Sequence, residues 1–363
     1  MTVSSSIIPR GVVFARYIKA LAIARGDILG AQAYAEGQNS WNIETPAVVA
    51  GFKAAVSAMG TGDSAGTLIH PVAVDFAEYL RPLTIIGRLK LRRAPFLTRL
   101  VLETSGTTAA WVGEVWQIPA TSAAFSFVGS SGTVSIQPTK VATLVALTSE
   151  LVKLSRPSAD ALIAADVGRA CATALDVGFI DPSNSGIPSV RPASVTYGAP
   201  SFVSGGAGLA EVDADLQLLV GSLTAAEMPF LSASWVMSPK TAAALGALRG
   251  SGGAPAYPGL GPTGGSLLGV PVLTSTAARG CIVLLEASEI LLADDGEAAI
   301  DYSEEASVQL SDTPNPTGGP TDSLGSPMVS LWENNLVGIR AARYANWVRR
   351  HPGAAAVLTG VAF

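Results

Sequence analysis

The sequence predicts an α+β protein, and three observations carry this prediction. One long amphipathic helix is expected from about Ser155 to Val177. A series of extended runs precedes this helix between about Arg92 and Lys140, and helical and strand patterns alternate after Ser189. At 363 residues, the chain is long enough for two or three lobes around a buried core.

The first 65 residues are expected to form a helical and extended arm rather than a domain of their own. Apolar side chains recur at helical spacing in the first part of this arm, at Phe14, Ile18, Leu21 and Ala22. Gly26 ends that pattern, a second short helix is expected over roughly 45–59, and the Gly-rich segment 60–66 is a break. An arm lying on a neighbouring subunit and a helical hairpin packed on its own chain both fit this pattern.

The extended runs between residues 92 and 140 predict a long antiparallel protrusion. Side chains alternate with a period of two over residues 96–103, and further extended runs are expected near Trp111, Ala124 and Val134. A two-stranded ribbon is barely stable alone in water. We therefore expect the protrusion to lie on another surface, such as that of a neighbouring subunit.

The predicted long helix has one apolar and one polar face. Its apolar stripe comprises Ile163, Val167, Ala170, Cys171 and Ala174. Its hydrated face comprises Asp166, Arg169, Thr173 and Asp176. Pro157 marks the start of the helix and Gly178 its end. The small residues on the apolar face would let another element approach closely.

The part of the chain after the helix predicts a separate α+β lobe over residues 189–292. Its expected elements are helices at 213–223 and 240–250, strands at 232–239 and 267–275, and a loop at 251–266. Residues 293–363 are expected to add further strands, with a turn at Ala293–Gly296.

The composition predicts that the chain buries much of its surface against copies of itself. Only 14% of its residues are charged, 48% are hydrophobic, and the mean hydropathy is +0.40. A compact monomer normally covers its surface with charge to stay soluble, so a chain this poor in charge is expected to form an oligomer. A monomer with an Ala-rich core is the alternative, since Ala raises such averages.

Charge, cysteines and hydropathy narrow the class of protein further. The net charge of −5 and the pI near 5.2 argue against a nucleic-acid-binding domain, although not against a shell around DNA. Cys171 and Cys281 are expected to be buried free thiols in a reducing compartment. We expect neither a membrane span nor a signal peptide, because no apolar run reaches about 18 residues and the N-terminus lacks the signal pattern. The chain is therefore expected to be made and used in the cytosol.

The sequence predicts no catalytic residue, no metal ligand set and no cofactor. His70 and His351 are the two histidines of the chain, and each precedes a proline in a turn-like setting. A Ser–His–Asp site or a His-rich metal site has little material here. Sequence signatures of nucleotide-binding loops, nucleophile elbows and paired cysteines are missing from the sequence.

Charged and aromatic groups in the protrusion and in the C-terminal part are the candidate contact residues between subunits. The basic run comprises Arg88, Lys90, Arg92, Arg93 and Arg99. The acidic run comprises Glu286, Glu289, Asp294, Asp295, Glu297, Asp301, Glu304 and Glu305. We expect the arginines to pair with carboxylates of an adjacent subunit, with Glu297, Glu304 and Glu305 as candidates, because such pairs set register and partner choice.

Other roles for these groups stay open at this point. Phosphate binding is the alternative for the basic run. The acidic run is expected to be a solvated turn and strand face, and a weak cation site at a subunit junction is its alternative. Four aromatic residues are the expected contact anchors of the protrusion: Trp111, Trp116, Phe125 and Phe127. Packing within their own chain is the alternative for them.

The ordered set of segments resembles the HK97-like major capsid proteins of tailed bacteriophages. The resemblance is carried by WVGEVWQIPATSAAFSFV leading into the long helix, by WVMSPKTAAALGALRG before a Gly/Pro loop and LLGVPVLTS, and by WENNLVGIRAARYANWVRR before AAAVLTGVAF. It covers about residues 65–363, and residues 1–60 match only as an arm. The whole series, rather than any single motif, is specific.

The resemblance implies a domain plan for the chain. The plan is an N-terminal arm (1–65), a first part of the peripheral domain (66–91), an extended loop (92–140), the peripheral domain with its spine helix (141–188), an axial domain (189–292) and a return segment of the peripheral domain (293–363).

The resemblance also implies a function and partners. The chain would assemble as hexamers and pentamers into an icosahedral head that encloses double-stranded DNA without sequence-specific binding. Scaffolding, portal and decoration or cement proteins are the further partners implied, with assembly in the host cytoplasm and a final location in the virion. An encapsulin-like shell that holds a cargo protein is the alternative, and a cytosolic hydrolase is a remote one.

One departure from the type member of this family concerns covalent cross-linking. That protein has a lysine beside the phenylalanine of its extended loop, which forms an isopeptide bond between subunits. Here the matching stretch, Ala124–Val128, contains no lysine, and Lys140 at the base of the loop is the nearest. The comparison therefore implies a non-covalent shell.

Overall fold

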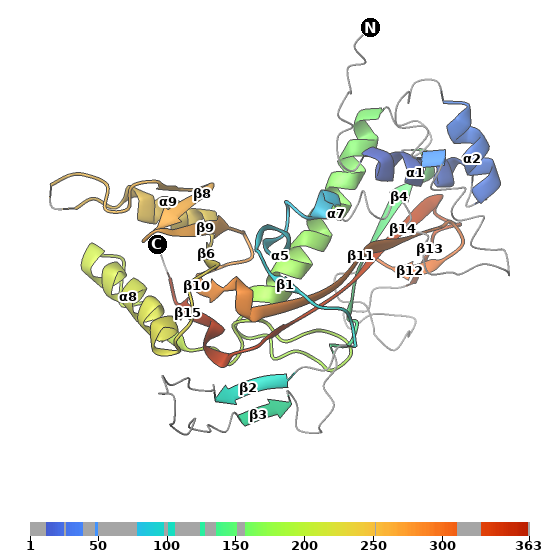
Figure 1. The fold of residues 1–363 in the computed structure, drawn as a ribbon. Coiled ribbons are helices and arrows are strands. Elements are labelled where there is room, and N and C mark those ends of the chain that lie inside the picture. Colours follow the sequence, from blue (N-terminus) through green and yellow to red (C-terminus); the bar gives the residue numbers. More distant parts are fainter. Residues whose placement is uncertain are drawn as a thin grey trace, which may run out of the picture. The chain divides into compact units, whose positions relative to one another are not determined.

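The chain has the predicted α+β architecture, and it divides into two discontinuous compact units (Figure 1). This computed structural model describes residues 12–24, 27–38, 48–49, 78–97, 101–105, 124–127, 136–150, 157–250, 252–310 and 328–361. The first unit comprises Met1–Leu83, Val141–Ala172 and Gly296–Tyr344, and the second comprises Thr84–Lys140, Thr173–Asp295 and Ala345–Phe363. Within the described residues, no helix is long and apolar enough to span a bilayer.

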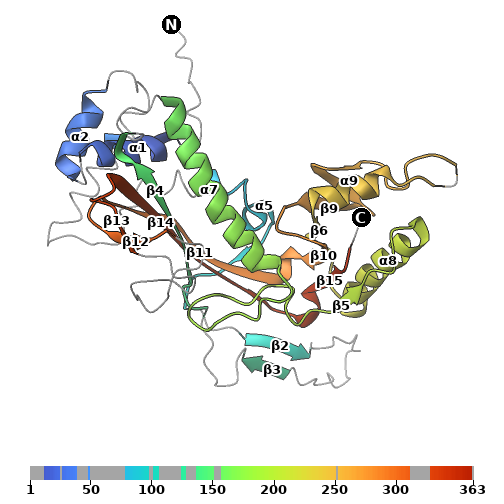
Figure 2. The same cartoon turned by 180° about the vertical axis from the view of Figure 1, so that it is seen from behind.

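Two short helices of the N-terminal arm pack into the core of the first unit. Helix α1 spans Val12–Ile23 and α2 spans Ile28–Glu36, so the break predicted near Gly26 is confirmed. Tyr17 of α1 is buried with Leu80 and with Val167 of the long helix α7 (Pro157–Ile180). Both views place α1 and α2 beside the first half of α7 (Figures 1 and 2). The second predicted arm helix, at 45–59, lies almost wholly outside the described residues.

A four-stranded sheet contains two strands of 14 residues each, β11 and β14. Its order is β1-β11-β14-β4, with β1 at Arg92–Arg93, β11 at Ile290–Ser303, β14 at Leu336–Arg349 and β4 at Lys140–Thr148. The first unit holds the antiparallel pair of β12 (Ser307–Gln309) and β13 (Met328–Ser330).

The turn predicted at Ala293–Gly296 is wrong, because β11 continues through these residues. Ala293 is fully buried and packs with Ile136 and Leu291. The backbone carbonyl of Leu292 accepts a hydrogen bond from Ala94 N at 2.9 Å. Burial and backbone pairing therefore hold this part of the chain extended in spite of its turn-like composition.

The second unit is built on a seven-stranded mixed sheet with the order β5-β15-β10-β6-β9-β8-β7. Its strands are β5 (Ser201–Val203), β6 (Ala233–Met237), β7 (Leu260–Gly261), β8 (Gly264–Leu267), β9 (Val270–Thr274), β10 (Cys281–Glu286) and β15 (Ala355–Thr359). The sheet thus takes in β15, from the segment assigned by sequence to the peripheral return, between β5 and β10. The boundaries of the six segments drawn from the sequence stay predictions.

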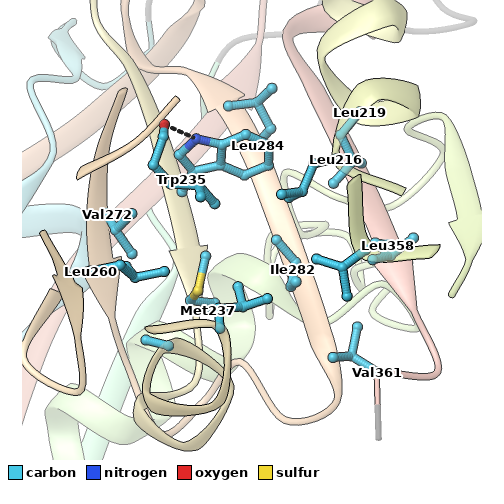
Figure 3. Close-up of a cluster of buried hydrophobic side chains, with 14 of the residues drawn as sticks. Leu216, Leu219, Trp235, Met237, Leu260, Val272, Ile282, Leu284, Leu358 and Val361 are labelled. Carbon is cyan, nitrogen blue, oxygen red and sulfur yellow. Dashed lines mark hydrogen bonds between the residues drawn. The ribbon is translucent and has the colours of Figure 1, made fainter. Parts of the chain in front are cut away.

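One core cluster fills a face of this sheet under two helices, α8 (Leu209–Ala225) and α9 (Pro239–Ala247). Leu216 and Leu219 of α8 lie against the strands that carry Trp235 and Ile282 (Figure 3). Trp235 is fully buried, and its indole Nε1–H donates to Leu267 O at 3.0 Å. The predicted helices near 213–223 and 240–250 and strands near 232–239 and 267–275 are confirmed.

The predicted loop at 251–266 is only partly correct, because residues 260–267 form the hairpin β7–β8. The segment before the hairpin is a compact tip. An isolated β-bridge joins Arg249 to Pro255, and Gly250 N donates to Ala254 O at 3.0 Å. Tyr257 anchors the base of the tip, since its hydroxyl donates to Asp213 of α8 at 2.5 Å.

The long helix α7 has the predicted position, but its buried face is rotated from the predicted one. Buried positions recur in adjacent pairs every four residues: Val167, Gly168, Cys171 and Ala172 in the first unit, then Leu175, Asp176, Phe179 and Ile180 in the second. Ala170 and Ala174, which were predicted in the apolar stripe, are exposed. Another segment does approach the helix closely, but at Gly168, outside the predicted stripe: a Cβ atom there would lie 2.6 Å from Cε1 of Tyr79.

Asp176 was predicted on the hydrated face of the helix and is instead 3% exposed. One oxygen of its carboxylate accepts the backbone N–H of Ile85 at 2.7 Å, and the other accepts the hydroxyl of Ser275 at 2.8 Å. Burial raises the pKa of Asp176 to about 6, against the opposing effects of these two hydrogen bonds and of the Arg88 charge. The side chain therefore ties α7 to two other segments of the second unit.

We predict that replacing Asp176 with Asn flattens the acid part of the stability profile. Between the ordinary pKa of 3.8 and the folded value of about 6, the folded chain binds a proton that the unfolded chain has released. The free energy of unfolding of the parent should therefore fall as pH rises through this window, by roughly 3 kcal/mol. Denaturant unfolding of the unassembled subunit from pH 4 to pH 7 measures this change. Asp166→Asn, at an exposed position of α7, is the control; equal slopes in parent and Asp176→Asn would contradict the prediction.

We predict opposite effects of the same substitution at two helical glycines. A Cβ atom at Gly246 of α9 would lie 2.4 Å from the backbone oxygen of Leu260, so Gly246→Ala should destabilise the subunit by about 1–3 kcal/mol. A Cβ atom at Gly221 of α8 meets no heavy atom within 4 Å, so Gly221→Ala should stabilise it by about 0.5–1 kcal/mol. Thermal unfolding of the two variants measures both changes in melting temperature. If Gly246→Ala also raises the melting temperature, the contact at Leu260 has no effect.

Candidate subunit contact surfaces

The predicted basic run lies on a segment that buried side chains hold in place. We call residues 84–97 the basic edge, because they carry four basic residues and no acidic one. Helix α5 (Ile85–Arg88) opens it, capped by Thr84 Oγ1, which accepts Gly87 N at 3.1 Å. Ile85 and Ile86 are buried, so the backbone that leads to β1 is fixed.

The arginines of the basic edge differ in what they contact. Arg88 is exposed, and its Nη1 donates to Thr274 O of the same chain at 2.9 Å. Arg92 and Arg93 form β1, whose backbone runs parallel to Leu291 and Leu292 of β11, and both side chains are exposed. Neither side chain forms a hydrogen bond or ion pair with any residue that the structure describes. Arg99 lies outside the described residues.

The C-terminal end of the basic edge combines a buried and an exposed apolar group. Ala94 and Phe96 pack against Ile136 and Leu291. The next residue, Leu97, is 66% exposed and has a φ of 63°, in the left-handed region that branched residues rarely adopt. Its amide donates to Ile136 O at 2.9 Å, which holds the side chain outward.

The acidic run is not one solvated face, so that prediction is wrong for its first members. Glu286 is fully buried at the end of β10. Its Oε1 accepts hydrogen bonds from Ser232 N at 2.9 Å, from Ser232 Oγ at 2.7 Å and from Ser288 Oγ at 2.6 Å. These donors, which no periodicity reveals, keep the carboxylate inside the fold.

Glu289, in the 3₁₀ turn η2 (Ala287–Glu289), pairs with its own chain. Its Oε2 lies 3.2 Å from Arg350 Nη1 and 3.7 Å from His351 Nε2. Of the three candidate contact carboxylates, Glu304 is half-buried and Glu305 is exposed, whereas the side chain of Glu297 lies outside the described residues. The acidic run therefore begins with carboxylates that bond within the chain, and Glu305 is the exposed one among the three contact candidates that the structure describes.

The predicted protrusion is confirmed as an antiparallel pair where the structure describes it. Strand β2 (Val101–Ser105) pairs with β3 (Ala124–Phe127), with an irregularity between Glu103 and Ser105. Phe125 stands opposite Glu103 in register, and Phe127 stands opposite Val101. The side chains of these strands, and Trp111 and Trp116 altogether, lie outside the described residues.

Sequence reasoning missed an exposed tryptophan in the first unit. Trp332 is 76% exposed on the turn between β13 and β14. Its neighbour Leu331 is fully buried, which fixes the turn on the core. The sequence Trp-Glu-Asn-Asn, an aromatic residue followed by turn formers, was a signal for an exposed turn. We interpreted this segment only as the start of the strand that follows it.

The described residues contain no group of three or more His, Cys, Asp and Glu side chains that would hold a metal ion. Cys171 and Cys281 are buried free thiols, as predicted, and burial raises the pKa of each to about 11. Thiols with such pKa values are poor nucleophiles at neutral pH.

Comparison with known proteins shows the family of this chain. The model of the phage capsid family matches residues 92–360. A capsid polyprotein of Pseudomonas phage PAJU2 is 39% identical over 97% of this chain and 54% of its own length, so this chain spans about half of that relative. A major capsid protein of Klebsiella oxytoca phage phiKO2 is 22% identical over 97% of this chain and 79% of its own length.

The solved structures agree on the fold. The capsid of a native GTA particle, determined with C5 symmetry, superposes with a TM-score of 0.51 at 13% identity, over 77% of this chain and 90% of that one. The HK97-like fold that the sequence predicted is confirmed. From the match over most of its length and from this shared fold, we conclude that the chain belongs to the phage capsid family.

Proposed function

We propose that this chain is the major capsid protein of a tailed phage or prophage. It assembles as hexamers and pentamers into an icosahedral head around double-stranded DNA, and it works by contact rather than by catalysis. The observation that carries this proposal is the family match over residues 92–360. Assembly in the host cytoplasm, with scaffolding, portal and cement proteins as partners, is part of the same proposal.

The surface of the described residues supports a role in assembly. Large apolar side chains are widely exposed in both units, among them Leu97 at 66% and Trp332 at 76%. Exposed apolar groups of this size are unfavourable in water, and they stabilise a protein when a partner covers them. Contacts with neighbouring copies therefore stabilise a subunit that exposes many such groups. Each contact is modest, and closure of the shell makes them collectively hard to undo.

The contacts we propose use the basic edge and the protrusion. Arg92, Arg93 and Arg99, with a smaller part for Arg88 because it already bonds Thr274, pair with Glu297, Glu304 and Glu305 of a neighbouring copy. The aromatic residues of the protrusion are the proposed apolar anchors: Trp111, Trp116, Phe125 and Phe127. DNA is enclosed without sequence-specific contacts, consistent with the net charge of −5.

We predict that the purified chain self-associates into capsomers, tubes or closed shells. Negative-stain electron microscopy shows the particles, and sedimentation velocity measures the fraction of chain in them across a concentration series. The expected profile has fast-sedimenting species that grow with concentration, because many weak contacts act together. A uniform monomer at every concentration would contradict self-assembly.

We predict that these particles hold together without covalent links. Since Ala124–Val128 contains no lysine, heating in SDS should release single chains of 36.9 kDa. Gel electrophoresis under reducing conditions distinguishes the outcomes. A ladder of linked subunits would show that Lys140 or another amine forms bonds between copies.

A further inference from the structure

Hydrogen bonds hold the turn that carries Trp332, although the tryptophan itself faces solvent. Leu336 N donates to Leu331 O at 2.8 Å, Asn334 Nδ2 donates to Ser330 O at 2.9 Å, and Glu333 N donates to Ser330 Oγ at 3.3 Å. An indole held outward by a fixed backbone loses little conformational entropy when a partner covers it. This is the arrangement of a preorganised contact anchor rather than of a mobile loop.

The turn that carries Trp332 and two segments hydrogen-bonded to it are acidic in sequence. Asn335 Nδ2 donates to Glu150 Oε1, and Leu331 N donates to Ala306 O at 3.0 Å, so segments 144–150 and 303–310 adjoin the turn. These two segments and residues 328–336 contain four glutamates and no Lys, Arg or His. We call the set of Trp332, Glu150, Glu304, Glu305 and Glu333 the Trp332 surface.

The basic edge is complementary to the Trp332 surface in both charge and polarity. It carries Arg88, Lys90, Arg92 and Arg93 against the four glutamates, and no acidic residue. It ends in Leu97, an exposed apolar group that matches the apolar centre of the other surface. A guanidinium also stacks favourably on an indole face, more so when both are removed from water.

We infer that the Trp332 surface of one copy docks the basic edge of a second copy. This inference rests on the proposed function and adds to it the anchor of the contact, Trp332, together with Glu150 and Glu333. The two surfaces differ from each other, so the contact is heterologous and passes from copy to copy around a ring. Two copies of the same surface repel each other, because each surface carries charges of one sign. All subunits of the ring therefore face the same way around it.

The first test is truncation of the anchor. Trp332→Ala should raise the concentration needed for assembly by about tenfold, the usual scale for losing one central aromatic contact. The melting temperature of the unassembled subunit should stay the same, because the side chain is exposed there. Leu231→Ala, at a still more exposed apolar residue of the other unit, is the matched control and should assemble like the parent.

The second test locates the partner of the surface. One preparation carries Glu333→Cys and another carries Arg93→Cys, and the two are mixed, assembled and treated with a short bis-maleimide. Because Cys171 and Cys281 are buried, the reagent reacts with the introduced cysteines. A linked dimer on a denaturing gel then shows that position 333 of one copy lies near position 93 of another. A mixture of Glu333→Cys with Leu231→Cys should give no such dimer.

The outcomes separate this inference from the proposed function. If the parent assembles, and either Trp332→Ala assembles at the same concentration or the mixed preparations give no linked dimer, the docking inference is refuted while the capsid function stands. A lowered melting temperature of unassembled Trp332→Ala also refutes it, because the side chain then acts within its own copy. If the parent itself never associates, both fall.

Discussion

The carboxylate of Asp176 fixes the point where the long helix meets the start of the basic edge. It satisfies the first amide of α5, at Ile85, and it also accepts the hydroxyl of Ser275, so one buried side chain holds three segments together. A buried carboxylate is costly unless its oxygens are bonded, and here both are. Thr84 completes the arrangement by capping the same short helix. The exposed position of Arg92 and Arg93 four residues beyond α5 depends on this anchoring.

The second organising feature is the buried sheet around Trp235. Strands β6 and β10 are buried along their whole length, so they read as short apolar runs, and the sequence locates them well. The positions of α7, α8 and α9 were also predictable, although their ends differ by up to four residues from the predicted ones, because proline, glycine and the 3.6-residue period mark them. What periodicity did not reveal was the sheet that β15 joins, because its partner strands lie mostly some 70–150 residues earlier in the chain. Pairing over such a separation leaves no local mark.

The errors on α7 and in the acidic run have one physical origin. Asp176 and Glu286 look like surface residues to any rule that assigns burial from polarity, and both are buried. Their burial is allowed by donors that come from elsewhere in the chain, Ile85 and Ser275 for one and Ser232 and Ser288 for the other. The complementary error is Trp332, a residue that the same rule would place inside. Candidate contact residues thus emerge from sequence only where exposure follows polarity, as at Arg92 and Arg93.

The tip between Arg249 and Pro255 has a consequence for the use of this chain as a carrier. The β-bridge between these two residues closes the tip, and Gly252 and Gly253 beyond it are exposed with open space around them. A peptide spliced between these glycines would extend from a closed base, leaving that bridge and the Tyr257–Asp213 bond in place. In a shell built from many copies, the foreign sequence would be repeated at regular spacing, once per subunit. Antigen display and the templating of ordered arrays are suited to such a position.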